Sequence, residues 1–242
     1  MTRIDRQELD RFLRRQGAVA WAAASNDPRL PAAPALPRAI SFLFHVEPSS
    51  LQALERGPTA AYYAEYVRIN ERLIATGAGL VGLLTANGYR AERVDDDAPE
   101  GPGYPPVFAS KTAATQAGLG WIGKTALLVT RDWGPAVRLG TVFTDLELET
   151  GTPLERGACG RCRACVDACP AGAGRERRWR AGTALEDLVD AAACERHQLH
   201  YPKYDNICGI CIWVCPFTRR AFRSAEPTAP ETEAAAPDGR QT

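Results

Sequence analysis

The stretch CGRCRACVDACP, which runs from Cys159 to Pro170, decides how the last third of this chain is organised. It places cysteines at 159, 162, 165 and 169, and a second run, CGICIWVCP at 208–216, repeats much of this spacing. Cys194 counts as the first cysteine of the second run, which then has four like the first. These are all eight cysteines of the 242 residues, so the first 158 residues contain none. Because disulfide frameworks belong to short secreted chains, thiolates spaced this closely indicate metal ligands.

The C-x2-C-x2-C-x3-C-P spacing matches the arrangement that binds two 4Fe-4S clusters, in which the fourth cysteine of each run ligates the other cluster. Structural zinc is the alternative, but it leaves the third cysteine of each run and both Cys-Pro steps without a role. The pattern therefore predicts two 4Fe-4S clusters and a chain that transfers electrons. The expected ligands are Cys159, Cys162, Cys165 and Cys215 for one cluster, and Cys169, Cys194, Cys208 and Cys211 for the other.

Charge and composition exclude several classes of protein. Lys plus Arg and Asp plus Glu number 29 each, so no net charge attracts nucleic acid or an anionic membrane. With 45% hydrophobic residues the chain can build one or two packed domains. Its apolar stretches fall short of the roughly 20 residues of a transmembrane helix, and the apolar run at 18–24 fits a strand better than a signal peptide. We expect a cytoplasmic protein without membrane contact.

Hydrophobic periodicity predicts the elements of the cysteine-free region. We expect helices over 5–15 and 60–86, the second capped by Thr59, and strands at 18–24, 38–46 and 89–94. The segment 110–145 adds a short helix, a glycine-rich turn and two strands joined at 132–135. The fold class is therefore α+β, with an α/β domain over 1–150, a ferredoxin-like double 4Fe-4S module over 151–222 and a disordered tail over 223–242.

The glycine-rich turn at Gly118, Gly120 and Gly123 has two interpretations. It is either a tight turn that needs a positive φ or a cradle for a cofactor. It is not the dinucleotide-binding fingerprint, because the glycines follow a helix and do not lie between a strand and a helix. The residues alone leave both interpretations open.

Three stretches resemble the epoxyqueuosine reductases and reductive dehalogenases, a family of cobalamin-dependent proteins with two 4Fe-4S clusters. They are AGLGWIGKTALLVT at 117–130, LGTVFTDLEL at 139–148 and ICGICIWVCPF at 207–217. The resemblance implies an oxidoreductase in which electrons pass through the clusters to cobalamin and then to the substrate. It also implies cobalamin contacts from Arg38, Gly120, Trp121, Gly123, Lys124, Leu128, Leu139 and Gly140.

The sequence also departs from this family. The aspartate that donates a proton in epoxyqueuosine reductases is missing, and the matching position falls near Tyr104, which we predict as the catalytic general acid, with packing over a core edge as the alternative. The sequence ends soon after the second cysteine run, without the helical-repeat extension that helps many such enzymes bind tRNA. We therefore expect a small organic substrate and do not expect tRNA.

The expected partner is an external electron donor of the flavodoxin or ferredoxin type. The arginine run Arg175, Arg177, Arg178 and Arg180 is a candidate surface for an acidic donor, with solvated loop charge as the alternative. Two other functions remain open at this point. One is a 4Fe-4S electron-transfer protein without a corrinoid, and the other is epoxyqueuosine reduction on tRNA.

Overall fold

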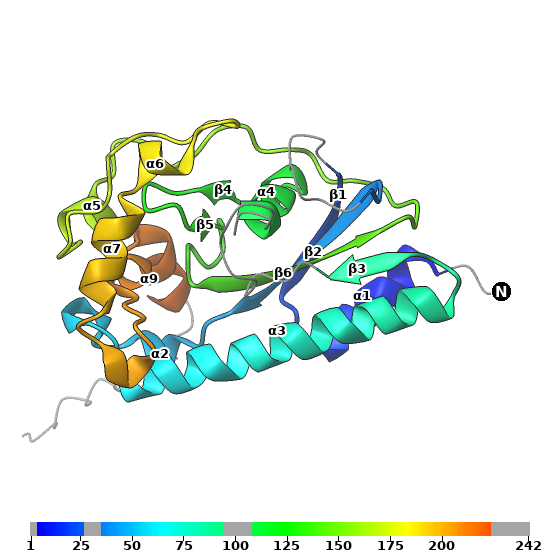
Figure 1. The fold of residues 1–242 in the computed structure, drawn as a ribbon, viewed down its shortest axis with the longest axis horizontal. Helices are drawn as coiled ribbons and strands as arrows, with labels where there is room; N and C mark the ends of the chain where they lie inside the picture. The colour runs from blue at the N-terminus through cyan, green and yellow to red at the C-terminus, as the bar shows by residue number, and fades with distance from the viewer. Residues whose placement is uncertain (1–3, 27–34, 94–107, 224–242) are drawn as a thin grey trace, which may run out of the picture.

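The computed structural model describes residues 4–26, 35–93 and 108–223 (Figure 1). Short helices fill the chain beyond residue 160, whereas the strands and the long helix α3 all lie before residue 145. In chain order the elements are α1 (Arg6–Arg15), β1 (Ala20–Ser25), β2 (Arg38–His45), α2 (Pro48–Leu51), η1 (Leu54–Arg56), α3 (Ala60–Ala86), β3 (Ala91–Arg93), α4 (Phe108–Gln116), β4 (Trp121–Ile122), β5 (Leu128–Val129), β6 (Val137–Thr144), α5 (Ala164–Asp167), α6 (Leu185–Leu188), α7 (Ala191–Gln198), η2 (Pro202–Tyr204), α8 (Ile210–Trp213) and α9 (Pro216–Arg223).

The main sheet has the strand order β1-β2-β6-β3. Each hydrogen-bonded pair in it is antiparallel, with Ala20 opposite Leu43 and Phe42 opposite Gly140. The mixed α+β class is confirmed. The α/β description of the first 150 residues needs correction, because α3 connects β2 to β3 but β6 inserts between these two strands and runs antiparallel to both.

Alternate residues of β2 serve the two faces of the sheet, as the two-residue period of a strand requires. Ile40, Phe42 and Phe44 pack into the core that the sheet forms with α1 and α3. Leu43 points to the other face and packs with Ala114 of α4 and with the β4–β5 hairpin. In Figure 1, α3 runs along one face of the sheet while α4, β4 and β5 lie over the other.

The long helix α3 has the bounds that the sequence predicts. The Thr59 side chain accepts a hydrogen bond from the backbone N–H of Tyr62 at 3.1 Å, which satisfies one of the free N–H groups at the helix start. Ile69, Leu80 and Leu84 are buried against the sheet at helical spacing. Helix α1 is likewise confirmed, with Asp5 as its N-cap.

The glycine-rich segment differs from its prediction in one respect. The strands on either side of 132–135 are β5 and β6, but they belong to different sheets, because β5 pairs with β4. Ala126 has a φ of 59° and turns the chain back between β4 and β5. Sequence periodicity detects strands and not their partners, so the pairing of β5 with β4 was not predicted. The strand β4 itself was missed because two residues are too few to show a period.

The cysteine-bearing segments gather at one end of the molecule, beside the start of α3 (Figure 1). Residues just beyond 150 hydrogen-bond back to the sheet region, with Gly151 N–H donating to the carbonyl of Ala23 at 2.8 Å. A domain boundary at residue 150 stays a prediction, and the predicted tail lies outside the described residues from 224 onward. In the described ranges no helix has both the length and the apolarity to cross a membrane.

Candidate functional site: two cysteine groups and the glycine-rich loop

The first cysteine group consists of Cys159, Cys162, Cys165 and Cys215, and its thiols line a cavity of about 110 Å³. Burial raises the pKa of the Cys165 thiol to about 11, and three neighbouring thiols add to this shift, those of Cys159, Cys215 and Cys162. The pKa of Cys215 is raised for the same reasons, burial first and then Cys159 and Cys162. Residues separated by 50 positions in the sequence are thus brought together as the crossed arrangement predicts.

The second cysteine group consists of Cys169, Cys194, Cys208 and Cys211, and it lies directly beside the first. Burial raises the pKa of Cys194, and the thiols of Cys169 and Cys208 raise it further. Burial also raises the pKa of Cys211 to about 12, with Cys208, Cys165 and Cys194 as its thiol neighbours. Because Cys211 also lines the cavity of the first group, the two groups are adjacent.

Local backbone geometry explains how short loops bring these thiols together. Gly209 has a φ of 88° and Gly160 a φ of 53°, so each Cys-Gly-x-Cys step turns through the left-handed region that favours glycine. Cys194 lies on α7, whose first turn is fixed by the Asp190 carboxylate accepting from Ala193 N–H at 2.9 Å. Cys215 directly precedes α9, where Pro216 occupies the first helical position.

The donor set fits two iron–sulfur clusters. All eight cysteines are free thiols, each at least partly accessible. Each group combines thiols from both runs, as crossed ligation of two clusters requires, whereas a structural zinc site closes a single tetrahedral set. The raised thiol pKa values mean that loading with iron must displace protons.

The glycine-rich loop contacts the first cysteine group through two predicted residues. Trp121 is buried, and its indole N–H donates to Cys159 Sγ at 3.3 Å. Its ring packs edge-on against Phe217, with 5.1 Å between the ring centroids. Lys124 is 5% exposed, and its Nζ donates to the backbone carbonyl of Cys162 at 2.7 Å. Sequence reasoning found both residues but not their contact with the cysteines.

The chain's own packing accounts for the glycines at 120 and 123. A Cβ on Gly120 would lie 2.5 Å from the carbonyl oxygen of Val129, and one on Gly123 would lie 2.8 Å from the Val129 side chain. The tight β4–β5 hairpin therefore requires both glycines. Gly118 has a φ of 77°, as expected for the turn interpretation. Contact of this loop with cobalamin stays a prediction.

Of the other predicted cobalamin residues, Leu128 and Leu139 share a core cluster with Trp121, whereas Gly140 and Arg38 do not belong to it. Gly140 faces the ring of Phe42, where a Cβ would lie 2.6 Å from Phe42 Cζ. Leu139 packs on the opposite face of the sheet in the core cluster that contains Leu128 of β5. Arg38 begins β2, four residues away from Phe42, and its Nη2 pairs with Glu147 at 2.5 Å.

The predicted general acid Tyr104 lies outside the described residues. The arginine run is described, and its four arginines are exposed. Arg175 pairs with Asp190 at 3.3 Å and Arg177 with Asp187 at 3.7 Å, while Trp179 is buried. Both interpretations of this run, a surface for an acidic donor and solvated loop charge, stay open.

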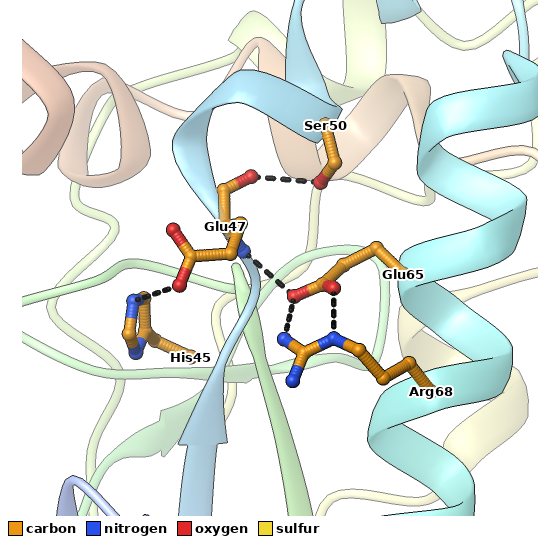
Figure 2. A network of polar contacts seen from close by, with 5 residues as sticks. All are labelled: His45, Glu47, Ser50, Glu65 and Arg68. Carbon is orange, nitrogen blue, oxygen red and sulfur yellow. Dashed lines mark hydrogen bonds and ion pairs between the residues drawn. The ribbon is translucent and has the colours of Figure 1, made fainter.

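A polar network around the buried Glu65 of α3 was not predicted (Figure 2). Glu65, only 7% exposed, accepts two hydrogen bonds from Arg68, at 2.7 and 2.8 Å, and one from the backbone N–H of Glu47 at 3.1 Å. Glu47 in turn lies 3.5 Å from the imidazole of His45. The i, i+3 spacing of Glu65 and Arg68 within a mostly apolar helix was the available signal.

Tyr62 is a second residue whose role sequence reasoning missed. It is 5% exposed, and burial strongly raises its pKa, with Cys211 and Cys208 adding to the shift. The ring therefore lies between α3 and the second cysteine group. Its place at the first turn of α3, directly after the Thr59 cap, fixes this position.

Comparison with known proteins agrees with this geometry. Residues 158–218 match the family described as a 4Fe-4S double cluster binding domain. The chain carries a double 4Fe-4S domain. This finding bears out two 4Fe-4S clusters and, with the crossed thiol groups, favours them over zinc.

Two curated relatives extend the similarity beyond the cysteines. An epoxyqueuosine reductase of Synechococcus sp. (strain CC9605) is 32% identical over 220 residues, which cover 86% of this chain and 64% of that protein. A tetrachloroethene reductive dehalogenase of Sulfurospirillum multivorans is 32% identical over 125 residues, 49% of this chain and 24% of that protein. The resemblance to these iron–sulfur oxidoreductases is confirmed, although the chain spans less than two thirds of either relative.

Two solved structures share the fold. A reductive dehalogenase described as suggesting a mechanism for B12-dependent dehalogenation aligns with a TM-score of 0.64 at 18% identity, covering 91% of this chain and 34% of that one. An epoxyqueuosine reductase with an epoxyqueuosine-modified tRNA stem loop aligns with a TM-score of 0.56 at 17% identity, covering 88% and 65%.

Proposed function

We propose that the protein is an iron–sulfur oxidoreductase that binds a corrinoid and reduces a small organic substrate with electrons from an external donor. The observation that carries this proposal is the direct contact between the glycine-rich loop and the first cysteine group, through Trp121 to Cys159 and Lys124 to Cys162. In the resemblance described above, the same loop belongs to the cobalamin-binding region. When bound, the clusters would supply one-electron transfer and the corrinoid a strongly reducing metal.

The residues beside this loop are compatible with a large, flat, apolar-faced cofactor. Half-buried apolar side chains of Leu119, Val137 and Leu139 adjoin Cys159 around one core cluster. Trp121, which is buried, and Phe217 pack edge-on within the same region. These side chains would orient a cofactor next to the first centre.

Epoxyqueuosine reduction on tRNA is the second candidate, and three observations favour it. The chain is 32% identical over 86% of its length to a protein of that name, and one structural neighbour holds a tRNA stem loop. Helix α9 also presents exposed Arg219 and Arg223 and carries no acidic residue. Against it stand the equal numbers of acidic and basic residues, 29 each. The expectation of a small substrate and a cytoplasmic location stays a prediction.

Anaerobic reconstitution tests the corrinoid. Protein loaded with iron, sulfide and hydroxocobalamin is desalted, and iron and cobalt are counted. About eight irons with one cobalt per chain is the expected result. About eight irons with no retained cobalt would contradict the corrinoid part and leave an electron-transfer protein. Binding of epoxyqueuosine-modified tRNA at two salt concentrations separates the candidates, because phosphate contacts weaken steeply as salt rises.

A further inference from the structure

Lys124 is a buried cation without an anionic partner among the described residues. Its side chain is on the turn between β4 and β5, it is 5% exposed, and its one hydrogen bond goes to the carbonyl of Cys162 at 2.7 Å. It lines the same cavity as five of the thiols, the four of the first group (Cys159, Cys162, Cys165 and Cys215) and Cys211 of the second. A charged group has therefore been taken out of water and placed against the first cysteine group.

Such a position is costly unless a negative charge lies nearby. An ammonium removed from water loses much of its hydration, and one neutral carbonyl replaces only part of it. Protonated thiols offer no charge. In the loaded centre four thiolates outweigh the iron–sulfide core, so the centre is anionic and faces the ammonium.

We propose that Lys124 is the counter-ion of the 4Fe-4S centre held by Cys159, Cys162, Cys165 and Cys215, and makes it the more easily reduced of the two centres. Reduction adds one electron from the donor to an already anionic centre and transfers no proton, so a fixed positive charge favours the reduced form. Net charge, hydrogen bonds to sulfur and exposure set cluster potentials. This inference rests on the double 4Fe-4S domain and does not depend on the corrinoid or the substrate.

The side chains around the two cysteine groups differ in charge, and the positive charge lies at the first group. At the first group, Trp121 adds an N–H bond to the Cys159 sulfur at 3.3 Å, beside the charge of Lys124. At the second group, the polar side chains that the described structure places near the sulfurs are uncharged. Gln198 has its amide nitrogen 3.6 Å from Cys194 Sγ, Thr125 lies beside Cys211, and the phenols of Tyr62 and Tyr201 lie near Cys208. An electron shared by the two centres would therefore reside at the first, next to the glycine-rich loop.

A redox titration followed by electron paramagnetic resonance tests the role of Lys124. Lys124→Met keeps the length of the side chain and removes its charge. At a fixed solution potential, we expect the ratio of reduced to oxidised first centre to fall at least tenfold, about 59 mV for one electron, with the second centre unchanged. Lys203→Met is the matched control, because Lys203 is exposed and its charge is screened by water, so neither centre should shift. An unchanged first centre in Lys124→Met would overturn the proposal.

A second measurement keeps the proposal testable if Lys124→Met loses iron. The Cys194→Ser variant should retain only the first centre, and the Cys215→Ser variant should retain only the second. Both variants keep Lys124. The first centre should then titrate at the higher potential. Equal potentials, or a higher potential for the second centre, would overturn the assignment. Neither experiment contains a corrinoid or a substrate, so failure of the proposed function leaves this result interpretable.

Discussion

The ring of Tyr62 lies against Gly209, in the loop between Cys208 and Cys211. A Cβ on Gly209 would lie 2.8 Å from Tyr62 Cε1, and the glycine has a φ of 88°. The first turn of α3 thus presses directly on the backbone that carries Cys208 and Cys211. The sheet region and the second cysteine group are therefore not independent, because one aromatic ring fills the space between them.

Gly209→Ala is expected to disturb the second centre. The left-handed conformation costs an alanine about 1 kcal/mol, and the new methyl group must also displace the Tyr62 ring. We expect a lower melting temperature and loss of up to about half of the iron, the share of one cluster. Iron content per chain and thermal unfolding of the reconstituted protein measure both effects.

The chain offers a matched control for this substitution. Gly160 occupies the same position in the first Cys-Gly-x-Cys step and has a φ of 53°, but a Cβ there would meet no atom within 4 Å apart from its own chain neighbours. Gly160→Ala therefore carries the backbone cost without the contact. Equal losses of iron in the two variants would show that Tyr62 has no part in the effect.

Several elements could be read from the sequence because their causes are local. Thr59 caps α3 through the N–H of Tyr62 only three residues away, and both ends of the helix matched their predictions. The crossed cysteine groups followed from spacing alone, since that spacing reflects the geometry of the cluster. In both cases the information lies within a short stretch of chain.

The contacts of the glycine-rich loop could not be read in this way. Trp121 and Lys124 each meet a residue 38 positions further on, and nothing in their own neighbourhood specifies that partner. The glycines at 120 and 123 suggested a cofactor cradle, whereas the adjoining strand β5 already fills the space beside them. Long-range packing decides these positions, and one sequence carries no record of it.

Substitutions of Glu65 and of Arg68 are expected to destabilise the protein by different amounts. Glu65 is buried, while the Arg68 side chain is 46% exposed. Arg68→Met leaves a buried carboxylate with one backbone donor, so we expect a loss of about 3 kcal/mol in the free energy of unfolding. Glu65→Gln keeps a hydrogen-bonding amide and lets Arg68 reach water, so about 1 kcal/mol is expected.

Denaturant unfolding measures the two losses. Glu71→Gln on the exposed side of the same helix serves as the control and should change stability by less than about 0.5 kcal/mol. A smaller loss for Arg68→Met than for Glu65→Gln would mean that water reaches the carboxylate, contrary to the burial shown by the structure.

The hydroxyl of Tyr63 predicts a dependence of stability on pH. It donates a hydrogen bond to the Asp205 carboxylate, in the insertion between Cys194 and Cys208. This bond, and burial to a lesser degree, raise the pKa of Tyr63 above its ordinary value of 10.0. Because the folded pKa is the higher one, the stabilisation is complete below pH 10 and is lost as the pH rises through the folded pKa.

Melting curves at pH 8 and pH 11 check this dependence. Tyr63→Phe should melt below the parent protein at pH 8, and the gap should narrow at pH 11. Tyr204→Phe is the control, because its ring packs on Tyr63 while no hydrogen bond is found for its hydroxyl in the described structure. A gap of constant size at both pH values would contradict the role of the hydrogen bond to Asp205.

Crossed ligation gives the sharpest prediction for the cysteines. If Cys215 belongs with Cys159, Cys162 and Cys165, then Cys215→Ser and Cys162→Ser remove the same centre although the residues are 53 positions apart. Each variant should retain about four irons, and the two residual resonance spectra should coincide. Cys169→Ser and Cys194→Ser should share the complementary spectrum. A Cys215→Ser spectrum that matched Cys194→Ser instead would mean that each run holds its own cluster, against the thiol neighbours found for Cys215.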